Sequence, residues 1–98
     1  MEITEVRISL MEDRKLRGFA NITLDDSFVI RGLKIIRGIE RYFIAMPRRR
    51  KQDGSYADVA HPIKHSFREE MEKVVLDKYW EAFNHRRSRV ESFETQLI

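Results

Sequence analysis

The sequence contains no cysteine, only two prolines and four glycines, and no long hydrophobic run. The absence of cysteine excludes a disulfide framework, a thiol nucleophile and a thiolate metal site. No stretch of about 18 consecutive apolar residues exists, which excludes a transmembrane helix. The first residues alternate with charges and lack the apolar region of a secretory signal. We therefore predict a protein that stays in the cytoplasm.

The chain is nonetheless rich enough in apolar residues to fold. Its 98 residues are 42% hydrophobic and 36% charged, which indicates one domain with a modest core. The formal net charge is +3, and the excess lies in residues 48–64, where five Lys and Arg stand against two Asp. A basic patch confined to one short segment bears on the choice of partner.

The first half of the chain is typical of antiparallel strands. Val6, Ile8 and Leu10 alternate with polar residues, and the same period of two resumes over 16–24. In the next run, 28–37, the apolar positions change parity at Gly32, which predicts a bulge that returns them to one face. Residues 42–46 are continuously apolar and indicate a strand buried on both faces or at a dimer contact.

The second half predicts a loop, a short strand and one helix. Residues 48–55 read as a loop with a turn at Asp53-Gly54, and 56–60 as a weak last strand. Ser66 and Glu69 have the spacing of a capping box that begins a helix. Its apolar stripe, which we expect to be core, comprises Phe67, Met71, Val74, Val75, Leu76, Tyr79, Trp80 and Phe83.

These elements predict an α+β fold. An antiparallel sheet of about four to five strands is covered by one C-terminal helix. We expect a single domain over 1–83, followed by a helix end and flexible polar tail over 84–98, where the apolar pattern decays.

The sequence does not favour an enzyme. His61 and His65 are four residues apart, but Pro62 between them argues against a shared helical face. No metal-ligand spacing and no glycine-rich phosphate loop is present. Asp25 and Asp26 are explained by turn chemistry. We expect no catalytic residue, cofactor, metal or small-molecule substrate, and no membrane partner.

The most distinctive local feature is the run of four cations at 48–51. One interpretation is a solubilising loop or an edge-strand guard. The other is a phosphate-binding arm, because arginine offers a planar fork that matches phosphate oxygens. Lys64 and Arg68 lie near the expected helix start, whose free N–H groups also attract anions.

Three segments together resemble the stage V sporulation protein G (SpoVG) family of bacteria. They are 28–38, FVIRGLKIIRG; 43–47, FIAMP; and 53–63, DGSYADVAHPI; SFREEM at 66–71 resembles the helix start that follows. The order and spacing of A-M-P, D-G and D-x-A-H-P-I make the match specific, and it covers roughly 1–83. The resemblance implies a small α+β homodimer without known catalytic activity, linked to septation and sporulation, that binds DNA and in some members RNA.

The chain departs from that family pattern at two places. Arg48 and Gln52 stand where the family often has serine and proline, which makes the loop more basic and less rigid. Residues 84–98 match no family pattern.

Two functional hypotheses follow. The first is a dimeric regulator that binds DNA and, as in some members of the family, RNA. In this hypothesis cations contact phosphates while Gln52 or His65 reaches base edges. The second is a protein-interaction module of the division machinery that binds no nucleic acid. The candidate nucleic-acid-binding residues are Arg48, Arg49, Arg50, Lys51, Gln52, Lys64, His65 and Arg68.

Overall fold

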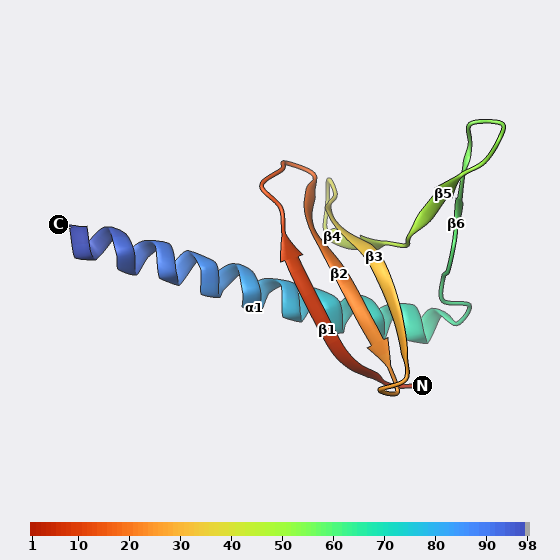
Figure 1. The fold of residues 1–98 in the computed structure, drawn as a ribbon, viewed down its shortest axis with the longest axis horizontal. Coiled ribbons are helices and arrows are strands. Elements are labelled where there is room, and N and C mark those ends of the chain that lie inside the picture. The colour runs from red at the N-terminus through yellow and green to blue at the C-terminus, as the bar shows by residue number, and fades with distance from the viewer. Residues whose placement is uncertain (98) are drawn as a thin grey trace.

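The computed structural model describes the backbone of residues 1–97 and the side chains of residues 1–87. A four-stranded antiparallel sheet, a separate two-stranded hairpin and one long helix form the molecule (Figure 1). The elements are β1 (Ile3–Leu10), β2 (Leu16–Leu24), β3 (Phe28–Arg37), β4 (Tyr42–Ala45), β5 (Arg48–Arg50), β6 (Tyr56–Asp58) and α1 (His65–Leu97). The α+β class expected from the sequence is confirmed.

The sheet is a meander in which β1, β2, β3 and β4 are neighbours in chain order. The turn between β2 and β3 places Asp25 and Asp26 at φ angles of 50° and 52°. Positive φ at two successive residues matches the right-handed twist of the flanking strands, and aspartate tolerates it better than most residues. The amide of Ser27 donates to the carbonyl of Leu24 at 2.9 Å and closes the turn.

The predicted bulge in β3 is present at Gly32. Gly32 has a φ of 80°, and the register between β2 and β3 shifts there. Its amide donates to Oδ1 of Asn21 at 3.1 Å, so the extra residue keeps a hydrogen-bond partner. The bulge brings Ile30 and Leu33 to the inner face, where they join the core. Phe28, at the end of the strand, stays exposed.

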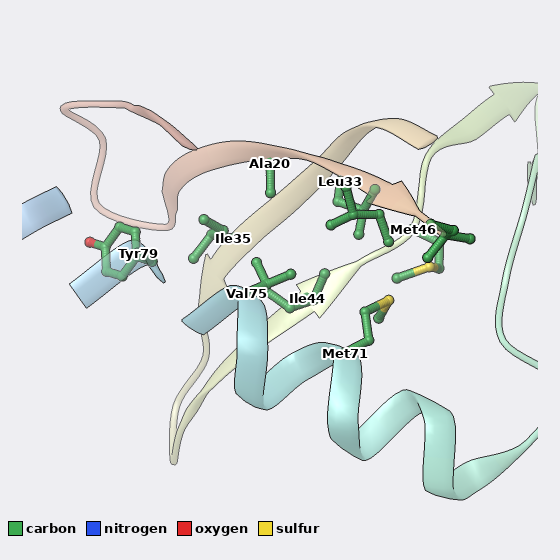
Figure 2. Packing of buried hydrophobic residues seen from close by; sticks show 10 residues of the cluster. Ala20, Leu33, Ile35, Ile44, Met46, Met71, Val75 and Tyr79 are labelled. Atoms are coloured by element: carbon green, nitrogen blue, oxygen red, sulfur yellow. The ribbon is translucent and has the colours of Figure 1, made fainter. Parts of the chain in front are cut away.

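Helix α1 lies across one face of the sheet and contacts β1, β2 and β4. Met71, Val75 and Tyr79 are spaced by four and point toward the sheet, where each is almost wholly buried (Figure 2). They pack on inward residues of the strands, among them Leu33 and Ile44. The buried cluster comprises Ala20, Ile22, Leu24, Leu33, Ile35, Ile44, Met46, Met71, Val75 and Tyr79.

The aromatic part of the predicted stripe needs one correction. Trp80 is 39% exposed, whereas Tyr79 is fully buried at 0%. One residue along a helix is a rotation of roughly 100°, so only one of two neighbours can face the sheet. Trp80 packs at the margin, with ring centroids 4.9 Å from Tyr42 and 5.7 Å from Phe83.

Both ends of the helix also differ from the prediction. The helix begins at His65, and the amide of Arg68 donates to the carbonyl of Lys64 at 3.1 Å. Ser66 therefore lies inside the first turn, and Glu69 pairs with His65 at 2.8 Å, an ion pair when His65 is protonated, in place of the expected capping box.

At the other end, the expected tail is helical through Leu97. Figure 1 shows the helix continuing beyond the sheet. The apolar stripe decays because no sheet remains to be covered, while glutamate, arginine, glutamine and leucine still favour helix.

Candidate nucleic-acid interface

The four cations of 48–51 belong to a β-hairpin rather than the predicted loop. β5 pairs with β6 in the register Arg48 to Asp58 and Arg49 to Ala57. The amide of Lys51 donates to the carbonyl of Ser55 at 2.7 Å, which extends the ladder toward the tip. The hairpin stands clear of the four-stranded sheet (Figure 1). The basic run is therefore displayed on an ordered arm.

The tip of this hairpin is closed by the predicted Asp53-Gly54 turn. Gly54 has a φ of +89°, and its amide donates to the carbonyl of Lys51 at 3.1 Å. Oδ1 of Asp53 accepts the hydroxyl of Ser55 at 2.6 Å and its amide at 2.9 Å. Both hydrogen bonds lower the pKa of Asp53, the one from the hydroxyl more than the one from the amide, and they favour the charged carboxylate. Gln52 lies exposed in the same turn.

The cations of the hairpin differ in their partners. Nε of Arg48 lies 3.2 Å from Oδ1 of Asp58, its neighbour across the two strands. Within the described residues, the exposed side chains of Arg49, Arg50 and Lys51 make no hydrogen bond or ion pair. Successive residues of a strand point to opposite faces, so Arg49 faces away from Arg48 and Arg50. The hairpin thus carries positive charge on both faces.

The candidate residues at the helix start form a second group at the base of the hairpin. His65 pairs with Glu69, and Nη1 of Arg68 lies 3.9 Å from Glu72. Glu72 is also 3.2 Å from Nη1 of Arg41, and its side chain is only 14% exposed. Lys64 is exposed and has no such partner in the described part of the chain. In this group, His65 and Arg68 therefore already face carboxylates of the helix, and Lys64 does not.

The hairpin and the connection to α1 also expose apolar side chains. Tyr56 and Val59 are largely exposed, and Ile63 is 91% exposed. A two-stranded hairpin alone is marginally stable in water. This apolar surface is therefore suited to a contact with another molecule.

The residues that the structure describes hold no group of three or more His, Asp or Glu that could bind a metal ion. No helix in the same part of the chain is long and apolar enough to cross a bilayer. Two cavities lie away from the hairpin tip: about 690 Å³ between the β1–β2 turn and α1, and about 510 Å³ beneath residues 60–64.

Comparison with known proteins places this architecture in a family. The SpoVG family model matches residues 1–81, which span the sheet, the hairpin and the packed part of α1. A relative from Anaeromyxobacter sp. (strain Fw109-5), named "Putative septation protein SpoVG", is 49% identical over 79 residues, covering 81% of each chain.

Two further relatives carry the same name. One from Myxococcus xanthus (strain DK1622) is 48% identical over 79 residues, covering 81% of this chain and 80% of its own. One from Finegoldia magna is 44% identical over 93 residues, covering 94% of this chain and 85% of its own. The resemblance seen in the motifs of 28–71 is confirmed, and the chain belongs to the SpoVG family of septation proteins.

Proposed function

We propose that this protein is a dimeric regulator that binds nucleic acid through the β5–β6 hairpin. The observation that carries the proposal is the group Arg49, Arg50 and Lys51, whose charges have no side-chain partner in the described residues. These cations project from an arm that stands clear of the sheet (Figure 1). Phosphate contacts would replace the missing counter-charges and release condensed cations from the strand.

The hairpin geometry is better suited to contacts with the phosphate backbone of a nucleic acid than to contacts with its bases. Arginine on both faces allows the arm to contact phosphates on either side. We expect Gln52, exposed at the tip, to reach the edge of a nucleotide base, and Lys64, exposed where the hairpin joins α1, to extend the positive surface. His65 and Arg68 contribute less in this account, because helix glutamates already pair with them. Phosphate contacts position the protein, so we expect modest sequence preference.

A dimer would double this arm. β4 is an edge strand of the sheet, and Phe43, 36% exposed, faces away from α1 beside its cross-strand neighbour Ile36. An exposed edge strand with apolar neighbours is an available surface for two-fold pairing. We expect sedimentation at micromolar protein to give a dimer mass. A monomer mass that does not change with concentration would contradict this expectation.

A second candidate function rests on the apolar surface of the same arm. Tyr56, Val59 and Ile63 offer a contact for another protein of the division machinery, without nucleic acid. Binding of that kind would depend weakly on salt, whereas binding through several phosphates weakens steeply.

The test measures DNA and RNA binding by fluorescence anisotropy across a salt series. The variant is Arg49→Gln with Arg50→Gln and Lys51→Gln, and the control with equal charge change is Arg7→Gln with Lys73→Gln and Lys78→Gln. The hairpin variant should lose affinity for all sequences, and its salt slope should fall by roughly one unit per lost contact. Parent-like binding and slope in a folded hairpin variant would overturn the proposal.

A further inference from the structure

A second concentration of arginine lies where the β1–β2 turn, the last residue of β3 and α1 meet. The cavity of about 690 Å³ between the β1–β2 turn and α1 is lined by five arginines and two carboxylates, a net charge of +3. The arginines come from three segments that are far apart in sequence. They are Arg14, Arg17, Arg37, Arg86 and Arg87. We call this cavity the arginine cleft.

Part of the arginine cleft is held in place by the protein itself. Nε of Arg17 donates to the hydroxyl of Tyr79 at 3.4 Å, and its Nη1 donates to the carbonyl of Asp13 at 2.8 Å. Arg86 forms an ion pair with Glu12 across the opening. The amide of Arg37 donates to the carbonyl of Lys15 at 2.8 Å and ties the end of β3 to the turn. These contacts tie the β1–β2 turn to α1 and to the end of β3.

Two of the guanidinium groups remain available. The exposed side chains of Arg14 and Arg37 make no hydrogen bond or ion pair with the residues that the structure describes. Neighbouring like charges repel, so an anion entering the cleft would be stabilised by both groups. A guanidinium fork matches the oxygens of phosphate in two parallel hydrogen bonds.

The lining of the cleft also has an apolar part. Leu10, Met11 and Phe83 line it beside the arginines, and Met11 is exposed. Ligand sites of roughly 300–1,000 Å³ combine such apolar surfaces with a few placed polar groups, and this cavity falls within that range. A flat apolar group and a phosphate on one ligand would fit both parts. Nucleotides carry both.

We propose that the arginine cleft binds a nucleotide, with its phosphate on Arg14 and Arg37 and its base against Met11 and Phe83. The nucleotide is either free or one unit of a bound strand, and both sources present the same chemistry. The site is separate from the hairpin and does not depend on it. A free nucleotide would depart from the expectation of no small-molecule ligand.

The single tryptophan provides a reporter for this test. The ring of Trp80 lies 4.9 Å from Tyr79 and 5.7 Å from Phe83 between centroids, and both residues line the cleft. Trp80 emission would be followed during titration with ADP, with pyrophosphate, and with a single-stranded oligonucleotide of about twelve nucleotides. EDTA would be present throughout.

The matched variants are Arg14→Gln with Arg37→Gln in the cleft, and Arg7→Gln with Lys73→Gln, two exposed positions outside both basic regions. We expect a saturable change for ADP or for the oligonucleotide, weakened about tenfold or more in the cleft variant and within about twofold in the control. Saturation by ADP identifies a free nucleotide, and saturation by the oligonucleotide alone identifies a bound strand. Thermal unfolding would establish that both variants are folded.

Three results would overturn the proposal. They are no saturable change in the parent, parent-like binding in the cleft variant, and pyrophosphate binding as tight as that of ADP, which would leave the apolar lining without a role. Failure of the proposed hairpin function would give a different result. The hairpin variant of the anisotropy series would then keep the salt-dependent nucleic-acid binding of the parent, independently of the result for the cleft.

Discussion

The hairpin and the arginine cleft are both basic, but they are built in different ways. The hairpin takes its charge from one contiguous run, Arg48–Lys51, on an arm outside the core. The cleft gathers arginines from three segments around Tyr79, a residue of the core. An arm is suited to phosphates along a strand, whereas a cleft with apolar lining is suited to one nucleotide. Under the two proposals, arginine would recognise a strand on one scaffold and a single nucleotide on the other.

The largest expected effect is a loss of stability at Tyr79, which lies in the core beside the arginine cleft and not in the hairpin. Tyr79→Ala removes a fully buried ring that packs in the core and a hydroxyl that accepts from Nε of Arg17, so it should lower the free energy of unfolding by about 3–5 kcal/mol. Tyr79→Phe removes only the hydroxyl and should cost about 0.5–1.5 kcal/mol. Urea unfolding measures both. A Tyr79→Ala midpoint equal to that of the parent would contradict the core assignment.

A smaller and more local effect is expected at Gly54 in the hairpin turn. Gly54→Ala places a side chain at a φ of +89°, which costs on the order of 1–3 kcal/mol. Because the hairpin stands clear of the sheet, amide exchange should accelerate over 48–58 while exchange in β2 and β3 stays unchanged. Equal acceleration in the sheet would show that hairpin and core unfold as one unit.

The smallest effect is expected from acid at the hairpin tip. The hydroxyl of Ser55 lowers the pKa of Asp53 in the folded state. Because the pKa is lower in the folded state, the charged carboxylate stabilises the turn at pH values above the ordinary aspartate pKa of about 3.9. This stabilisation is lost as the pH falls through the pKa of the folded state. Below that range the amide of Ser55 should shift in NMR spectra, and Asp53→Asn should show no such titration. Titration of the parent at or above the ordinary value would contradict this.

Much of the fold was predictable because local patterns and packing agree. The parity change at Gly32 predicted the bulge, and the positive φ and register shift confirm it. The sequence could not show which of Tyr79 and Trp80 is the more deeply buried, because a wide apolar stripe does not indicate which of two neighbours faces the sheet. β5 was missed because three arginines show no apolar alternation, and its pairing depends on β6.

The two basic regions were not equally predictable. The hairpin cations are adjacent in sequence, so counting charge by segment finds them. The cleft arginines lie in two stretches whose net charges are near zero. Residues 1–47, which include Arg14 and Arg37, carry eight Lys and Arg against seven Asp and Glu, and residues 65–98, which include Arg86, carry six against seven. Only the fold brings them together, and no sequence signal short of a correct tertiary arrangement would find them.

The contrast between the two regions is tested most directly by amide chemical-shift mapping on the full chain. Spectra would be recorded with added ADP and, separately, with a single-stranded oligonucleotide at low salt. The account predicts that the oligonucleotide shifts the amides of 49–54. It also predicts that ADP shifts the amides of residues 14–17 and 37. If the cleft binds only a nucleotide that is part of a strand, the oligonucleotide shifts these amides instead. An oligonucleotide that binds but leaves 49–54 unshifted would contradict the assignment of the hairpin as the nucleic-acid arm.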